Sequence, residues 1–153
     1  LVAVRGSGGM AKAVVAAFRD SGFSNLTIFS RNEATGRALA EKYGFTWAAE
    51  GELVNAAPFD VLVNVTPIGM SGGNEGELSF PETLIEAATV VFDVIAMPAV
   101  TPLLEKAVAS GKVAITGLEI MALQAAIQFK LYTGISLTAD QVQRAAEFSR
   151  LQS

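Results

Sequence analysis

The stretch L-V-A-V-R-G-S-G-G-M-A-K, residues 1–12, decides the fold. It begins with four apolar residues, 1–4, which is the pattern of a strand buried in a parallel sheet. A glycine-rich turn follows at residues 6–9, and an alanine-rich helix is predicted over residues 10–21, before the helix-stopping Gly22. This succession of strand, glycine turn and helix indicates the first unit of a Rossmann fold.

Strands and helices alternate through the rest of residues 1–116. Further strands are predicted at residues 26–29, 61–65, 90–95 and 113–115, and helices at residues 33–43 and 102–110. Strands and helices that alternate at this spacing form βαβ units. We therefore predict an α/β fold of the Rossmann type, a doubly wound parallel sheet with helices on both faces. The glycine-rich segment 71–79 is expected to be a mobile loop.

The pattern changes at residue 117, which separates a predicted Rossmann domain, 1–116, from C-terminal helices, 117–153. Residues 118–132 form a helix that is apolar on nearly every side and needs more cover than one sheet face supplies. Residues 138–151 form a second, amphipathic helix that opens with a capping box of Thr138 and Gln141. Because residue 1 is Leu and already lies in a strand, we expect a segment of a longer protein, on whose missing part these helices pack.

Composition excludes several classes of function. The chain has 153 residues, 51% hydrophobic and 17% charged, which suits one globular domain. It has neither His nor Cys, so thiol and Ser-His catalysis and the usual zinc sites are excluded, and we predict no metal. A net charge of −4 without basic blocks argues against nucleic acid, and no apolar run suits a membrane span. We expect a cytoplasmic protein with a small-molecule substrate and leave a homodimer open.

The glycine turn is the first candidate site. Gly6 allows the tight turn, Gly8 lets the backbone approach a pyrophosphate, and Ala11 permits close packing of helix and strand. The start of the helix offers unpaired N–H groups and a partial positive charge to phosphate oxygens. A purely structural turn is the alternative. The residues predicted to hold a dinucleotide here are Gly6, Ser7, Gly8, Gly9, Met10 and Ala11.

The second strand ends on Ser30, Arg31 and Asn32 instead of an acid. An Asp or Glu at this point would bind the ribose hydroxyls and repel a 2′-phosphate. The three residues remove that repulsion and supply a guanidinium that suits phosphate. We therefore predict that the site prefers NADP over NAD. The alternative is that Arg31 is only a solvated surface charge.

Residues 64–70, N-V-T-P-I-G-M, leave the carboxyl end of another strand, where open α/β sheets place their ligands. Asp93 and Glu119 are the carboxylates nearest the predicted cleft, and we expect Asp93 to cap a turn or a neighbouring helix rather than act as a base. Trp47 is expected to pack in the core or at its edge. The chain thus shows a cofactor site without an acid–base pair, and the proton donor for hydride transfer should lie outside it.

Together these motifs resemble the C-terminal half of shikimate dehydrogenases. The resemblance covers nearly the whole chain in order, and its most specific part is residues 117–134, G-L-E-I-M-A-L-Q-A-A-I-Q-F-K-L-Y-T-G. It implies the NADP-dependent interconversion of shikimate and 3-dehydroshikimate, on the route to chorismate and aromatic amino acids. It also implies that a catalytic Lys–Asp pair lies in an N-terminal substrate domain outside this chain, to which the C-terminal helices return.

By position, the resemblance assigns further roles. Residues 6–10 would hold the pyrophosphate and residues 30–32 the 2′-phosphate. The residues implied on the nicotinamide side are Thr66, Pro67, Ile68, Gly69, Val94 and Gly117, and Gln124 matches a substrate-binding glutamine.

Three departures from the family pattern leave alternatives open. Ser-Arg-Asn replaces Asn-Arg-Thr, and Thr35 replaces a second Arg, with Arg37 nearby but out of register, so NAD stays open as a cofactor. Ala96 replaces a substrate-contacting Tyr, and Met97-Pro98 follows where Asn-Pro is common. Arg5 replaces a small apolar residue for no reason visible in the sequence.

These departures favour a shikimate dehydrogenase-like paralogue that acts on quinate or a related substrate as one alternative. A non-catalytic NADP-sensing module is another. A dehydrogenase of the methylenetetrahydrofolate type is a third, against which residues 117–134 argue.

Overall fold

The computed structural model describes residues 1–151 and contains one sheet of six parallel strands. The strands are β1 (Val2–Arg5), β2 (Leu26–Ser30), β3 (Thr46–Ala49), β4 (Val61–Asn64), β5 (Val90–Asp93) and β6 (Val113–Ile115). Their order across the sheet is β3-β2-β1-β4-β5-β6. The chain winds outward from β1 first in one direction and then in the other, so the predicted doubly wound Rossmann-type sheet is confirmed.

Six α-helices and one 3₁₀ helix lie among the described residues. They are α1 (Gly9–Asp20), α2 (Glu33–Tyr43), η1 (Glu50–Asn55), α3 (Glu82–Ala87), α4 (Pro102–Ala109), α5 (Gly117–Thr133) and α6 (Ala139–Leu151). All the helices that the sequence predicted are present, within a residue or two at their ends. The sequence did not predict β3, η1 or α3.

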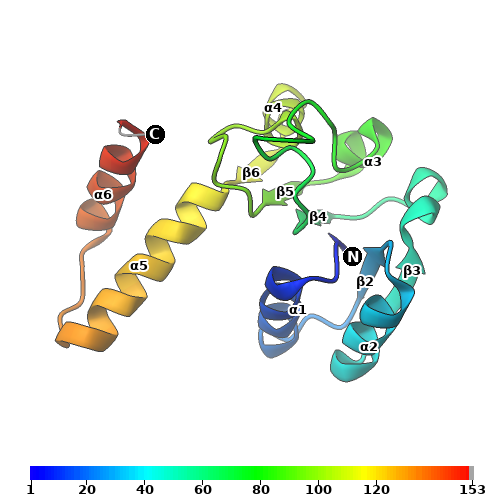
Figure 1. Ribbon diagram of the computed structural model, residues 1–153, viewed down its shortest axis with the longest axis horizontal. Helices are drawn as coiled ribbons and strands as arrows, with labels where there is room; N and C mark the ends of the chain where they lie inside the picture. The colour runs from blue at the N-terminus through cyan, green and yellow to red at the C-terminus, as the bar shows by residue number, and fades with distance from the viewer. Residues whose placement is uncertain (152–153) are drawn as a thin grey trace.

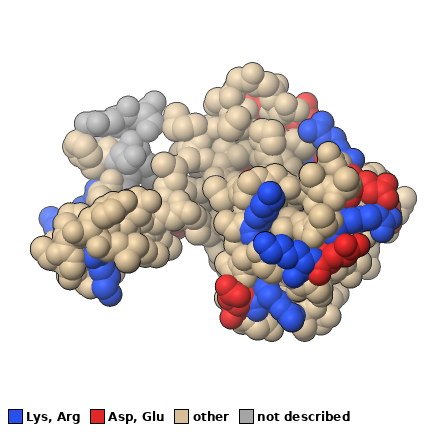
Figure 2. All heavy atoms as spheres, turned by 60° about the horizontal axis from the view of Figure 1, so that its bottom comes forward, with Lys and Arg blue, Asp and Glu red and all other residues tan. Residues whose placement is uncertain are grey.

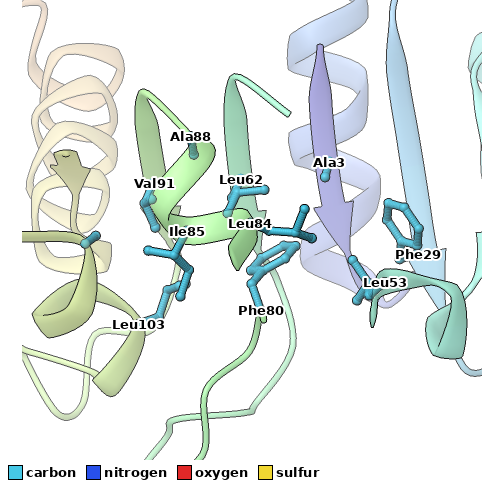
Figure 3. Packing of buried hydrophobic residues seen from close by; sticks show 11 residues of the cluster. Ala3, Phe29, Leu53, Leu62, Phe80, Leu84, Ile85, Ala88, Val91 and Leu103 are labelled. Carbon is cyan, nitrogen blue, oxygen red and sulfur yellow. The ribbon is translucent and has the colours of Figure 1, made fainter. Parts of the chain in front are cut away.

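The helices cover both faces of the sheet, as Figure 1 shows. Side chains alternate along β1, so that Val2 and Val4 join one core cluster and Ala3 joins the other. The first cluster includes Ala11 and Val15 of α1 and packs α1 and α2 on the sheet. The second gathers side chains from η1, α3 and α4 on the opposite face (Figure 3).

The segment predicted to be a mobile loop, residues 71–79, consists largely of turns. Its ends are fixed, because the Ser71 N–H donates to the Met97 carbonyl oxygen at 3.2 Å and Ser79 is fully buried next to Phe80. Mobility of the part between these ends stays a prediction.

The C-terminal arm, residues 117–151, leaves the sheet beyond β6. Figure 1 shows α5 running outward and α6 turning back beside it. Of the residues of α5 only Gly117 and Leu118 are buried, and the remainder of this apolar helix faces solvent in large part. Figure 2 shows an arm that is mostly uncharged, whereas basic and acidic side chains intermingle on the Rossmann part. No helix within residues 1–151 has both the length and the apolar character needed to cross a membrane. Residues 152 and 153 lie outside the described residues.

Candidate functional site

The glycine turn meets the exit of β4 at the centre of the sheet edge. The Gly6 N–H donates to the Phe29 carbonyl oxygen at 2.8 Å, and the φ angle of +120° is one that glycine adopts without strain. A Cβ on Gly6 would lie 2.9 Å from Cγ2 of Val65 and 3.1 Å from Cγ2 of Thr66. The glycine turn and the segment after β4, which the sequence analysis treated as separate candidates, therefore lie in contact. They meet between β1 and β4, where the strand order reverses and where open α/β sheets bind ligands.

The start of α1 is open to an anion. Gly8 is the N-cap and provides no side chain to cap the helix, and the first turn carries no acidic residue. A Cβ added to Gly8 or Gly9 would meet nothing within 4 Å, so the space beside the free N–H groups is unfilled. Ala11 is fully buried against the sheet, as its fingerprint position predicts, whereas Met10 is exposed. This geometry fits a pyrophosphate, which needs backbone donors and room for close approach.

A hydroxyl pair joins the glycine turn to the segment after β2. The Oγ of Ser7 lies 2.7 Å from the Oγ1 of Thr35 in the first turn of α2. The N-cap of α2 is Asn32, whose Oδ1 accepts from the Thr35 N–H at 3.0 Å. The hydrogen bond between Ser7 and Thr35 therefore links the segment predicted to bind the pyrophosphate to the segment predicted to bind the adenosine ribose.

The hydroxyl of Ser30 supports the β2 turn from inside. It is buried, donates to the Asn32 carbonyl oxygen at 3.0 Å and accepts from Nε1 of Trp47 at 3.0 Å. Gly36 leaves the room for this contact, because a Cβ there would overlap both the Ser30 Oγ and the indole. Of the three residues predicted at the 2′-phosphate, only Arg31 carries a cation, and its side chain is 84% exposed.

Arg5, for which the sequence offered no role, forms an ion pair with Glu50. Its Nε and Nη2 donate to Oε1 of Glu50, at 3.0 and 2.8 Å, and its Nη1 donates to the Ser79 carbonyl oxygen. Glu50 follows β3 directly, beside Arg31, whose Nε lies 3.9 Å from the glutamate Oε2. Sequence reasoning missed this acid because it missed β3. The signal was the short run F-T-W-A-A at residues 45–49, which Glu50 follows directly.

Asp93 is the centre of a buried network and not a free base. Its Oδ1 accepts from Nδ2 of Asn64 and from the Ile95 N–H, each at 3.1 Å, and its Oδ2 accepts from Oγ1 of Thr101 at 2.7 Å. Thr101 is the N-cap of α4, so the expectation that Asp93 serves a turn or a helix cap is confirmed. Burial raises the pKa of Asp93, although its three hydrogen bonds act in the opposite direction.

The same network shapes the segment after β4. The Oδ1 of Asn64 accepts from the N–H and the Oγ1 of Thr66, at 3.1 and 2.6 Å. Its Nδ2 also donates to the Ile68 carbonyl oxygen at 3.1 Å, and the next residue, Gly69, is buried. Of the residues of this segment implied on the nicotinamide side, Thr66–Gly69, Pro67 is the one that is exposed. Hydrogen bonds of the Asn64 side chain therefore fix the conformation of this loop.

Gly117 lies against the end of β5. A Cβ there would stand 2.5 Å from the Val94 carbonyl oxygen and closer still to that of Ile95. The structure thus brings together Val94 and Gly117, both implied on the nicotinamide side. Glu119 completes a capping box, since its Oε2 accepts from the N–H and the Oγ1 of Thr116, at 2.8 and 2.9 Å.

Gln124 stands apart from these residues. It is exposed on α5, seven residues and therefore roughly 10 Å along the helix axis from Gly117. A groove of about 1040 Å³ lies between β6 and the two helices of the C-terminal arm, and none of the predicted cofactor-binding residues lines it. Across residues 1–151 no cluster of three or more His, Cys, Asp or Glu could hold a metal.

Comparisons with known proteins show that the chain is similar to shikimate dehydrogenases and to a shikimate dehydrogenase-like protein. No family model matches it. The shikimate dehydrogenase-like protein of Haemophilus influenzae is 49% identical over 150 residues, which cover 97% of this chain and 54% of the relative. The shikimate dehydrogenase (NADP(+)) of Ignicoccus hospitalis is 33% identical over 135 residues, which cover 88% of this chain and 50% of the relative. The chain spans about half the length of these curated relatives.

Solved structures agree with this placement. A shikimate 5-dehydrogenase-like protein superimposes with a TM-score of 0.91 at 48% identity, over 97% of this chain and 55% of that one. Shikimate 5-dehydrogenase from Thermus thermophilus, in complex with NADP(H) and shikimate, gives a TM-score of 0.80 at 29% identity, over 95% and 54%. Quinate dehydrogenase from Corynebacterium glutamicum, in complex with NAD, gives 0.84 at 27% identity, over 97% and 54%.

Proposed function

Because the chain belongs to the shikimate dehydrogenase family, of whose curated members it spans about half, we propose that it is the nucleotide-binding part of an NADP-dependent oxidoreductase. The proposed reaction is the reversible reduction of 3-dehydroshikimate to shikimate. The observation that carries the proposal is the contact of Gly6 with Val65 and Thr66 beside the uncapped start of α1. This contact would place a phosphate site next to the loop that would face the nicotinamide.

The proposed pyrophosphate site uses backbone groups. The N–H groups at the start of α1 would donate to the phosphate oxygens, and the helix dipole adds partial positive charge. Gly8 and Gly9 allow the approach because nothing occupies the space where their side chains would be.

The adenosine end would be recognised by Arg31. Its exposed guanidinium can form charge-assisted hydrogen bonds with a 2′-phosphate, while Asn32 fixes the start of α2 beside it. This is the basis for proposing NADP over NAD.

The nicotinamide end would lie along Thr66–Gly69, Val94 and Gly117. When bound, the nicotinamide would exchange a hydride with the substrate carbonyl carbon, whose oxygen must gain or lose a proton. Asp93 and Glu119 are both committed to helix caps, so neither is free to move that proton. We therefore assign proton transfer to an N-terminal substrate domain, against which the C-terminal arm would pack and present Gln124 to the substrate.

Substitution of Arg31 tests the cofactor assignment. A hydrogen bond to a charged group contributes about 1.5–3 kcal/mol, so Arg31→Ala should weaken NADPH binding by about ten- to a hundredfold. NADH lacks the 2′-phosphate and should bind unchanged. An equal loss for both nucleotides, measured by titration, would contradict the proposed contact.

A steady-state assay of the full-length protein tests the reaction. NADP reduction should depend on shikimate and should be absent without substrate. The isolated chain should bind nucleotide and turn over nothing, because no acid–base pair faces the site in residues 1–151. Turnover by the isolated chain would show that the catalytic groups are misplaced.

Quinate is the second candidate substrate. Ala96 and Met97 follow β5 where the family pattern has a substrate-contacting Tyr and an Asn, and a quinate dehydrogenase is among the structural neighbours. Faster NADP reduction with quinate than with shikimate would favour this alternative. Nucleotide binding without turnover on either substrate would favour a sensing module.

A further inference from the structure

Glu50 lies between two arginines at the carboxyl edge of the sheet. Arg5 ends β1, Arg31 follows β2 and Glu50 follows β3, whose last residue Ala49 pairs with Ser30. The neighbouring strand therefore supplies, close to the proposed adenosine site, the acid that is absent at the end of β2.

The two arginines contact this acid in different ways. The Arg5 side chain is only 15% exposed, and its guanidinium donates two hydrogen bonds to Oε1 of Glu50 and one to the Ser79 carbonyl oxygen. Arg31 lies 3.9 Å from Oε2, beyond hydrogen-bond distance, and is largely solvated. Glu50 is thus committed to Arg5 and attracts Arg31 only weakly.

We propose that Arg5 and Glu50 are positioning residues that set the preference for a ribose 2′-phosphate through Arg31. Glu50 competes with the phosphate for the Arg31 guanidinium. Arg5 limits this competition, because it occupies Oε1 and balances the carboxylate charge. The inference rests on the proposed NADP site and gives a role to the arginine that departs from the family pattern.

The test is the ratio of the dissociation constants of NADH and NADPH, in which a general loss of folding cancels. Glu50→Gln keeps an oxygen for Arg5 but removes the charge, so NADPH should bind about two- to fivefold more tightly, the range of an exposed ion pair, with NADH unchanged. Arg5→Gln should weaken NADPH by a similar factor, because Glu50 can then pair fully with Arg31. The double variant R5Q/E50Q should regain the ratio of Glu50→Gln.

The matched control is Glu52→Gln in the same 3₁₀ helix. Glu52 accepts from the Ala49 N–H and the glutamine retains that acceptor, so the ratio should not change. In an Arg31→Ala background, Glu50→Gln should have no effect. If Arg5→Gln does not fold, the ratio measured for Glu50→Gln alone tests the inference.

Two outcomes would overturn the inference, and they differ in what else they remove. If Arg31→Ala lowers the ratio but Glu50→Gln leaves it unchanged, the inference is wrong and the proposed NADP site stands. If Arg31→Ala also leaves the ratio unchanged, the 2′-phosphate contact itself is wrong, and this inference falls with it.

Discussion

The Asp93 carboxylate is buried at the end of β5, and its effect on stability depends on pH. Burial raises its pKa above the ordinary value of 3.8. The folded chain therefore binds the Asp93 proton more tightly than the unfolded chain does. The free energy of unfolding should consequently fall as the pH rises from about 3.8 through the folded-state pKa.

Asp93→Asn should remove this pH dependence. The amide can keep its oxygen toward Asn64 and Ile95 and turn its nitrogen toward Oγ1 of Thr101. Urea unfolding at a series of pH values should show the variant gaining stability relative to the parent as the pH rises. Two parallel pH profiles would mean that the carboxylate does not titrate differently in the folded chain.

Two glycines at the first position of a helix should respond in opposite ways to alanine. In Gly117→Ala the new methyl group meets the backbone of Val94 and Ile95, which cannot turn away, so we expect a loss of about 1–3 kcal/mol. In Gly9→Ala the methyl group meets nothing within 4 Å, and stability should be unchanged or slightly higher. Denaturant midpoints measure both. Equal stability of the two variants would contradict the packing described for α5.

At the scale of elements, Asn32 joins the fold of α2 to the proposed site. Asn32→Ala removes the acceptor of the Thr35 N–H and should cost about 1 kcal/mol of stability. Asn32→Asp keeps a good N-cap but places a negative charge beside the proposed 2′-phosphate. We therefore expect near-parental unfolding for Asn32→Asp together with weaker NADPH binding. If Asn32→Ala lowers the free energy of unfolding but neither variant changes the affinity for NADPH, Asn32 serves the helix alone.

The elements that the sequence predicted are those with strong local signals. The first strand, α1 and α4 carry continuous apolar runs, glycine stops or a proline start, so their positions followed from local chemistry. β3 has four residues and lies at the sheet edge, where half-buried side chains leave no clear alternation. α3 has only six residues. Such short elements depend on packing, which the local pattern does not reveal.

The features of the candidate site also fall into those that local sequence predicts and those that depend on packing. The glycine turn and the open start of α1 followed from spacing alone, because backbone geometry requires glycine there. The inward hydroxyl of Ser30 and the Arg5–Glu50 pair did not, since each depends on β3 lying beside β2. Contacts between strands far apart in sequence are the part of a site that one sequence shows least.

At the scale of the whole molecule, the C-terminal arm carries more apolar surface than its own contacts cover. Ile127 and Leu131 on α5 are 60% and 77% exposed, as are several neighbours to a similar degree. Most of the basic and acidic side chains visible in Figure 2 lie instead on the Rossmann part. A surface of this kind indicates an interaction site, in agreement with the proposed packing on a substrate domain.

Polar substitution of the arm should therefore have different effects in the isolated chain and in the full-length protein. In the isolated chain, Ile127→Ser with Leu131→Ser should leave nucleotide binding unchanged, because neither side chain is buried in the Rossmann core. In the full-length protein the same pair should lower both thermal stability and NADP reduction, because burial of each side chain against the substrate domain would be worth about 1.5–3 kcal/mol. The matched control is Val108→Ser on α4, which is 64% exposed and should be neutral in both proteins. If the arm variant is as stable and active as its parent at full length, α5 does not form the domain interface.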